Sequence, residues 1–191
     1  MVVAVTTVDR KRAYTADEFE ELPNDKKLYE LIERALVRKM SPGDEHGQIS
    51  FHLLTHLILL DPQHKLGMMW PGTSFRLNPT NVPIPDLAFV VAGRIPPKSK
   101  KAMAVIPDLV VEVHSPRYLA SQARRTLTDL KIRLYQVAGV QIIWAINPSN
   151  QTVEVYHQGQ LAPVVVLSLG DDLDGEAVIP GFKLRVSQLF E

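Results

Sequence analysis

The sequence contains no cysteine among its 191 residues. This absence excludes a disulfide framework, a thiolate metal site and a cysteine nucleophile, and it is typical of proteins in a reducing compartment. No apolar run approaches the roughly 20 residues that span a bilayer. The apolar residues 1–7 have no basic residues ahead of them and no cleavage-site pattern. We therefore expect a cytoplasmic protein with no membrane partner.

Three common catalytic motifs are also missing. The ten glycines are scattered, so the sequence has no glycine-rich phosphate-binding loop. Ser115-Pro116 lacks the flanking glycines of a nucleophile elbow. His52 and His56 are four residues apart, but the glutamate of the zinc protease motif is absent and two histidines without a third ligand make a poor zinc site. Packing or solvent exposure is the better interpretation of these histidines.

The formal net charge is zero, with 21 basic and 21 acidic residues, but the charges are unevenly distributed. Residues 1–93 carry 10 basic and 12 acidic side chains, residues 94–133 carry 9 and 3, and residues 134–191 carry 2 and 6. Attraction to a polyanion depends on the local patch rather than on the total. Neutrality therefore does not exclude nucleic acid as a partner, although an ordinary solvated surface could have the same composition.

Hydrophobic periodicity and the positions of helix- and strand-breaking residues predict one α/β domain over residues 1–191, with residues 1–13 as a loosely ordered N-terminal arm. Thr15 and Glu18 form a capping-box pattern, and apolar residues recur every three or four positions between residues 49 and 60. Gly139 is a plausible left-handed helix cap. Helices are expected over 16–22, 44–60 and 118–138, and strands over 29–32, 35–37, 87–91, 109–113, 142–146, 153–156 and 164–169, followed by a final short element.

The most informative residue is Glu112, which lies inside the apolar segment 109–113. Strand alternation places it on the face shared by Val110 and His114. Ionised carboxylates are almost never buried unless they are paired or bind a metal, because desolvation costs several kcal/mol. Glu112 therefore needs a partner, which is either a metal ion or a lysine or arginine of the core.

Asp86 stands at the start of the neighbouring apolar segment 87–91. If the two segments are adjacent strands, Asp86 and Glu112 converge at one end of the sheet, and such hard oxygen ligands suit Mg²⁺ or Mn²⁺. Taken alone, an acid after proline is more often a strand-entry cap. Lys131 lies beside an apolar helical stripe, one turn before Tyr135. Its ammonium could extend to solvent or face the acid pair, and periodicity does not decide between these.

A series of short motifs runs along residues 15–190: Tyr29-Glu30-Leu31, Ser41-Pro42, His46, Pro85-Asp86, Pro107-Asp108-Leu109-Val110-Val111-Glu112-Val113-His114-Ser115-Pro116, Lys131, Tyr135, Gly139-Val140, Trp144, Pro180-Gly181-Phe182 and Leu189-Phe190. Taken as a series, these motifs resemble the Uma-type family of predicted restriction endonucleases, a domain family of unknown function in the PD-(D/E)XK nuclease superfamily. The resemblance implies an α/β (α+β) restriction endonuclease-like core, with a mixed central sheet flanked by helices and preceded by a helix and a hairpin.

The resemblance also implies roles for particular residues. Asp86 and Glu112 would hold Mg²⁺ (or Mn²⁺), with the backbone carbonyl of Val113 as a further ligand. The superfamily's usual lysine position is His114 here, so the lysine is displaced to Lys131 on the following helix, and Glu30 completes the site. His46 and His114 would support these residues. A cap or an ordinary hydrogen bond explains His46 equally well, and for His114 an ordinary strand histidine is the more common case.

The leading hypothesis is therefore a Mg²⁺-dependent endonuclease that hydrolyses phosphodiester bonds in DNA, with a homodimer implied by the resemblance. The basic residues expected to contact the DNA backbone are Arg94, Lys98, Lys100, Lys101, Arg117, Arg124 and Arg125.

Three polar positions depart from the family pattern. The first hairpin turn is Glu33-Arg34 instead of Asp-Gly, Leu127 stands where the family favours an acid, and the later strand has Ile142-Ile143-Trp144 and ends at Asn147. These losses favour an alternative, a weakened or inactive nuclease fold that binds nucleic acid or acts as an assembly module. A third option is an ion-paired core with no polyanion partner.

Overall fold

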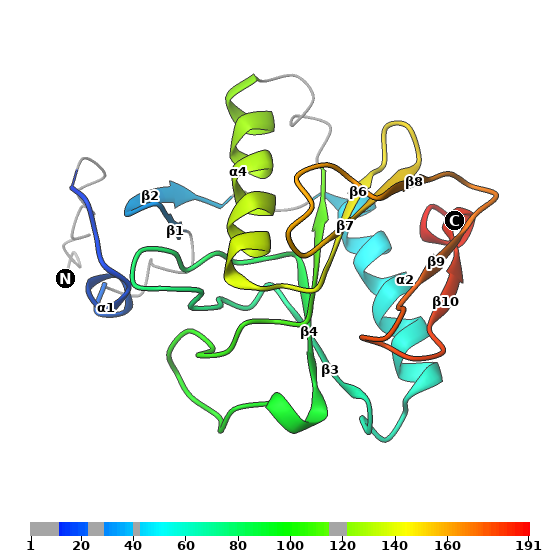
Figure 1. Cartoon of the computed structure of the whole chain (residues 1–191), viewed down its shortest axis with the longest axis horizontal. Helices are drawn as coiled ribbons and strands as arrows, with labels where there is room; N and C mark the ends of the chain where they lie inside the picture. The colour runs from blue at the N-terminus through cyan, green and yellow to red at the C-terminus, as the bar shows by residue number, and fades with distance from the viewer. Residues whose placement is uncertain (1–11, 23–28, 40–42, 115–121) are drawn as a thin grey trace, which may run out of the picture.

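Six strands form one mixed sheet at the centre of the fold (Figure 1). In hydrogen-bonded order they are β3 (Gly67–Pro71), β4 (Leu87–Val91), β5 (Leu109–Val113), β6 (Ile142–Asn147), β7 (Thr152–His157) and β8 (Val165–Leu167). β5 and β6 pair in parallel, and the other four pairs are antiparallel. A parallel pair needs a crossover connection, and here it carries α4 (Gln122–Ala138).

The computed structural model describes residues 12–22, 29–39, 43–114 and 122–191, and the side chains of residues 122–126 are not among those described. Most of the expected N-terminal arm and the first residues of the helix expected from residue 118 lie outside this range. Within the described part of the chain, no helix has the length and apolar character needed to cross a bilayer.

Two long helices cover opposite faces of the sheet (Figure 1). α2 (Asp44–Leu60) packs through Ile49, Leu53 and Leu57, at the predicted helical spacing, against the face of β5 formed by residues 109, 111 and 113. Full burial of each such aliphatic side chain is worth about 1.5–3 kcal/mol. α4 covers the other face, where Tyr135 shares a cluster with Val110. The alternation predicted for β5 is therefore confirmed.

The N-terminal elements are α1 (Ala16–Glu20) and the hairpin of β1 (Tyr29–Ile32) and β2 (Ala35–Arg38). Thr15 and Glu18 form the predicted capping box, and α1 ends two residues earlier than expected. Glu33 and Arg34 have φ angles of 47° and 69°, so a tight turn forms although its residues are not the preferred ones. This hairpin is bound to the segment before β4 through hydrogen bonds between Leu31 and Val82, of 3.2 and 2.8 Å.

The chain ends in a small hairpin of β9 (Asp172–Asp174) and β10 (Lys183–Arg185), followed by the 3₁₀ turn η3 (Val186–Leu189). These elements pack on the α2 side, where the rings of Phe182 and Trp144 lie 5.6 Å apart. β3 and β9 were not expected from the sequence, because neither contains a β-branched residue. A second 3₁₀ turn, η2 (Ala92–Arg94), follows β4.

Candidate active site

The pairing of β4 with β5 brings Asp86 and Glu112 together. The antiparallel register pairs Leu87 with Val111. Asp86, which precedes Leu87, therefore lies opposite Glu112, which follows Val111. The backbone N–H of Val113 donates to Oδ2 of Asp86 at 2.8 Å, which fixes the aspartate at the end of β5. The expected convergence of the two acids is therefore what this sheet produces.

Glu112 is buried and its carboxylate has two partners on α4. Lys131 Nζ and the Tyr135 hydroxyl each lie 2.7 Å from Oε1 of Glu112. The two donors are four residues apart, so they project from the same side of the helix. Lys131 is itself buried, at 5% exposure, and it faces the acids rather than extending to solvent. The alternative that the periodicity left open is thus decided by packing.

Glu30 is the third acid of the cluster and comes from β1. Its Oε1 accepts a hydrogen bond from the Ile84 backbone N–H at 2.7 Å and lies 2.9 Å from Lys131 Nζ. Lys131 therefore bridges Glu30 and Glu112. Docking of the hairpin beside residue 82 places Glu30 here, and its proposed part in the site stays a prediction.

Two further basic side chains contact Asp86. His46, in the first turn of α2, has Nε2 at 2.8 Å from Oδ2 of Asp86. Lys39, which follows β2, has Nζ at 3.3 Å from Oδ1. The sequence suggested a supporting role for His46, and the contact agrees with that role. Lys39 was missed, because its position depends on the hairpin and no local pattern marks it.

The ionisation of the cluster follows from burial and from these contacts. Burial by itself would raise the pKa of Asp86, but the hydrogen bond from His46 and the charge of Lys39 outweigh it, so this pKa is lowered. Burial raises the pKa of Glu112 despite the opposing charge of Lys131. Burial would lower the pKa of Lys131, but the adjacent Glu112 and Glu30 raise it instead. The lysine is thus held as an ammonium, and the two facing acids differ in proton affinity.

The donor set fits a divalent ion of the Mg²⁺ type. Asp86 and Glu112 offer hard carboxylate oxygens at one end of the sheet, and Mg²⁺ is usually held by one or two carboxylates plus water and substrate phosphate. Among the residues that the structure describes, no group of three or more His, Cys, Asp and Glu side chains is arranged as a ready metal cage.

His114 directly follows β5 and is buried on the α4 side of the sheet. Burial lowers its pKa, although the charges of Glu154 and Asp129 oppose the shift. Its backbone N–H donates to the Ile146 carbonyl at 2.8 Å, which continues the ladder between β5 and β6. The structure thus places His114 at the rim of the acid cluster as a neutral histidine, and its suggested support of the site stays a prediction.

The basic residues expected to contact DNA are spread over several places. Arg94 follows the end of β4 opposite Asp86, roughly 17 Å of strand away at about 3.3 Å per residue. Its guanidinium is paired with Asp108, and it donates to the Ile106 carbonyl at 3.0 Å. Lys101 lies 3.3 Å from Glu20. Lys98 and Lys100 are exposed.

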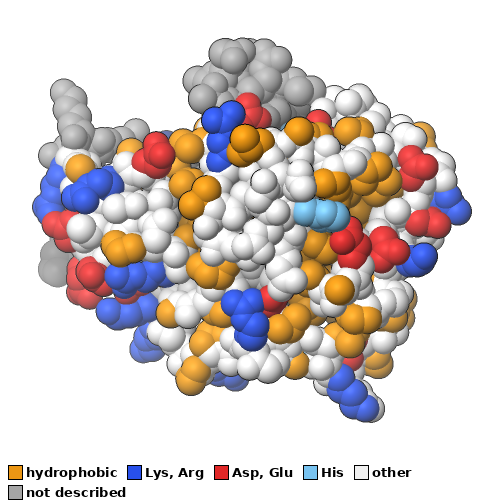
Figure 2. Space-filling view, viewed as in Figure 1, with side chains coloured by type: hydrophobic (Ala, Val, Ile, Leu, Met, Phe, Trp, Pro, Cys, Tyr) orange, Lys and Arg blue, Asp and Glu red, His pale blue; other side chains and the backbone are white. Residues whose placement is uncertain are grey.

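The remaining basic candidates are not described at side-chain level: Arg117 lies outside the described residues, and the side chains of Arg124 and Arg125 are not among those described. On the face drawn in Figure 2, basic and acidic side chains are mixed toward the left, the side of α1, and acidic side chains gather toward the right, the side of β9 and β10, beside a few basic ones.

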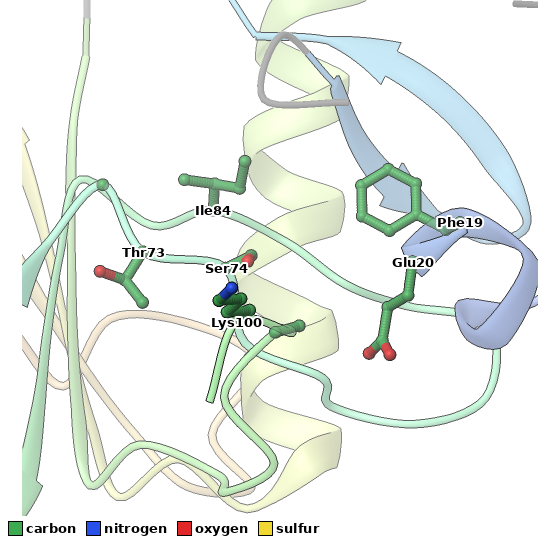
Figure 3. A pocket seen from close by; sticks show the side chains of 8 residues that line it. Phe19, Glu20, Thr73, Ser74, Ile84 and Lys100 are labelled. Carbon is green, nitrogen blue, oxygen red and sulfur yellow. The ribbon is translucent and has the colours of Figure 1, made fainter. Parts of the chain in front are cut away.

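A pocket of about 380 Å³ lies between α1 and the segments around Thr73, Ile84 and Lys100 (Figure 3). Ile84 lines it with its side chain while its N–H binds Glu30. The residues labelled around it are Phe19, Glu20, Thr73, Ser74, Ile84 and Lys100. None of the three clustered acids lines this pocket, so the acid cluster is the better candidate for chemistry.

A mixed sheet has helices on both faces, and acids at the start of β4 and in β5 lie near a lysine of the crossover helix, which is an arrangement of the nuclease-like α+β class. Comparison with protein-family models matches residues 16–187 to the family Uma2, described as "Putative restriction endonuclease". The chain belongs to this family, as its motifs indicated.

Comparison with solved structures supports the same fold. A crystal structure from Anabaena variabilis ATCC 29413, described as a "putative nuclease belonging to DUF820", matches with a TM-score of 0.74 at 24% sequence identity. The match covers 92% of this chain and 97% of that one. No curated protein matches the chain.

Proposed function

We propose that this protein is a metal-dependent nuclease that hydrolyses phosphodiester bonds in DNA. The observation that carries the proposal is the meeting of Asp86 and Glu112 at the end of β5, with Lys131 in direct contact with Glu112. Membership of a nuclease-like family supports the same activity. The nucleic acid being DNA, and the ion being Mg²⁺ or Mn²⁺, are parts of this proposal.

In the reaction, a water oxygen bonds to phosphorus, the bond from phosphorus to one sugar oxygen breaks, and the leaving oxygen gains a proton while the water loses one. Asp86 and Glu112, with the Val113 carbonyl as the further proposed ligand, would hold the divalent ion, which when bound would act as a Lewis acid on the phosphate and lower the pKa of a bound water. Lys131 donates hydrogen bonds that orient the water or stabilise charge on the phosphate oxygens. Glu30 and Tyr135 hold Lys131 and Glu112 in place.

The direct test is cleavage of supercoiled plasmid with Mg²⁺ or Mn²⁺. We expect Asp86→Asn, Glu112→Gln and Lys131→Met to lose about 100-fold or more of the rate, as loss of one stabilising group typically costs. Glu176→Gln removes an exposed acid outside the cluster and is the matched control, expected to cut at the wild-type rate. Circular dichroism confirms that each variant is folded. Undiminished cleavage by Glu112→Gln and Lys131→Met would refute the site.

One observation favours a second candidate, a nuclease fold that binds nucleic acid without cutting it. The acids of the cluster already have cationic partners within the chain, Lys131 for Glu30 and Glu112 and Lys39 for Asp86. Salt-dependent DNA binding with no cleavage under any divalent ion would establish this candidate. Size-exclusion chromatography with light scattering would test the homodimer that the family resemblance implied.

A further inference from the structure

The ammonium of Lys39 contacts two oxygen atoms beside the acid cluster, a backbone carbonyl and a carboxylate oxygen. Its Nζ donates to the Ile84 carbonyl at 2.6 Å and lies 3.3 Å from Oδ1 of Asp86. The side chain is 23% exposed, so the ammonium stands at the solvent-facing edge of the cluster, unlike the buried Lys131. No other lysine in the described part of the chain has a contact with Asp86 among its hydrogen bonds and ion pairs.

The position of this ammonium has the chemistry of a cation site. A carboxylate oxygen and a backbone carbonyl are the ligand types that Mg²⁺ and Mn²⁺ prefer. Ile84 is also held through its backbone N–H, which donates to Glu30 at 2.7 Å. The positive charge of Lys39 also acts on Glu112, where it favours the ionised form. Lys39 thus supplies at Asp86 part of the charge compensation that a divalent ion would supply.

We propose that Lys39 is an internal cation that competes with the divalent metal for Asp86. The inference rests on the proposed function, since it requires that Asp86 takes part in metal binding. A lysine ammonium and a divalent ion beside the same carboxylate repel each other, and the repulsion is strong where the surroundings are partly desolvated. Metal binding therefore displaces Lys39 from Asp86, and the cost of the displacement lowers the affinity for metal.

The first experiment measures Mn²⁺ affinity by calorimetry and by electron paramagnetic resonance of free Mn²⁺. Lys39→Met removes the charge but keeps an apolar stem, and we expect it to bind Mn²⁺ about tenfold more tightly, equivalent to 1.4 kcal/mol. Lys39→Arg keeps the charge and is expected to bind like the wild type. Lys183→Met makes the same change in net charge at an exposed pair with Asp174, and we expect no effect. Equal or weaker binding by Lys39→Met overturns the inference.

The second experiment uses the unaltered protein. Amine-reactive labelling read by mass spectrometry reports the exposure of each lysine with and without Mg²⁺. We expect labelling of Lys39 to rise several-fold on adding Mg²⁺, while Lys131 stays protected and Lys183 is unchanged. Labelling of Lys39 that stays constant or falls, while calorimetry shows Mg²⁺ bound, contradicts displacement.

The two proposals fail in different ways. Wild-type protein that binds Mn²⁺, with a Lys39→Met variant that binds no more tightly, overturns the competition and leaves the metal-dependent nuclease intact. A variant that binds Mn²⁺ when the wild type does not supports the competition. Absence of binding in both proteins overturns both proposals.

Discussion

Lys131 and Tyr135, one turn apart on α4, contact the same oxygen of Glu112 at 2.7 Å each. A single helix face therefore satisfies an acid that the strand pattern placed in an apolar environment. Burial raises the pKa of the Tyr135 hydroxyl, and the charge of Glu112 adds to the shift, so the hydroxyl is held as a hydrogen-bond donor. The two donors on α4 therefore explain how the carboxylate of Glu112 can be buried away from solvent.

Tyr135→Phe removes one of these two hydrogen bonds and leaves the ring in place. We expect a loss of about 1.5–3 kcal/mol in the free energy of unfolding, as for a buried hydrogen bond to a charged group, together with reduced cleavage. Urea denaturation and the plasmid assay measure the two effects. The matched control is Tyr156→Phe, whose hydroxyl donates to Glu154 at 2.6 Å. The control should lose stability but retain cleavage, and equal loss of cleavage in both variants would contradict the special position of Tyr135.

Lys131→Met leaves two buried carboxylates without their bridging cation. Removing one partner of a buried pair typically costs about 3–5 kcal/mol, so we expect a loss of this size in urea denaturation. Adding Glu112→Gln to this variant should restore part of the loss, because one uncompensated charge is removed. The exposed pair of Lys183 and Asp174 is the control cycle, with an expected coupling below about 1 kcal/mol. Strict additivity at Lys131 and Glu112 would show that the contact contributes no stability.

Asp61 makes the stability of the fold depend on pH. Burial would raise its pKa, but backbone N–H groups of Leu66 and Lys65 donate to it at 2.7 and 2.8 Å and lower the pKa below the ordinary value of 3.8. A lowered folded-state pKa means that the unfolded chain takes up the proton first, so this stabilisation is present above pH 3.8 and is lost as pH falls below it.

Asp61→Asn tests this dependence. At pH 7 the wild type should melt at a higher temperature than the variant. The difference in melting temperature should shrink as pH falls below about 4. Comparing the two proteins at each pH cancels the titration of the other acids. A difference that is the same at pH 7 and at pH 3 would exclude the charge of Asp61 as its source.

The turn between β1 and β2 is strained. Glu33 and Arg34 both have positive φ angles, which cost about 1–2 kcal/mol for a residue with a side chain. We expect the double change Glu33→Asn and Arg34→Gly to raise the melting temperature by about 2–4 °C, since 1 kcal/mol shifts a domain of this size by that amount. Arg133→Gly, at an exposed position within α4, should lower it instead. A fall for both variants would contradict the strain in the turn.

Local pattern was sufficient to predict most elements of the fold. The capping box of Thr15 and Glu18 marks α1, the apolar spacing marks α2, and continuous apolar runs mark β4 and β5. The strands that were missed, β3 and β9, contain no β-branched residue. They form because neighbouring strands supply hydrogen-bond partners, and a local sequence pattern does not predict a partner that is distant in sequence.

The candidate site divides in the same way. Glu112 could be singled out because it is an acid inside an apolar strand. Asp86 could be singled out because it stands at the start of the second apolar segment, 87–91. Whether Lys131 faced solvent or the acids, and whether Arg94 was free or paired with Asp108, could not be decided from spacing. The orientation of Lys131 and the pairing of Arg94 both depend on which side chains of other elements lie next to them in the fold.

The sequence by itself determined that this chain has no thiol chemistry, a mixed α/β core and a carboxylate that requires a partner, because these follow from composition and from strand and helix periodicity. Only the tertiary structure showed which atoms of Glu30 and His46 contact Lys131 and Asp86, and only it revealed that Lys39 lies beside Asp86. The physical reason is that charge compensation acts across space at a few ångströms, and the register of β4 with β5 and the docking of the hairpin set those distances.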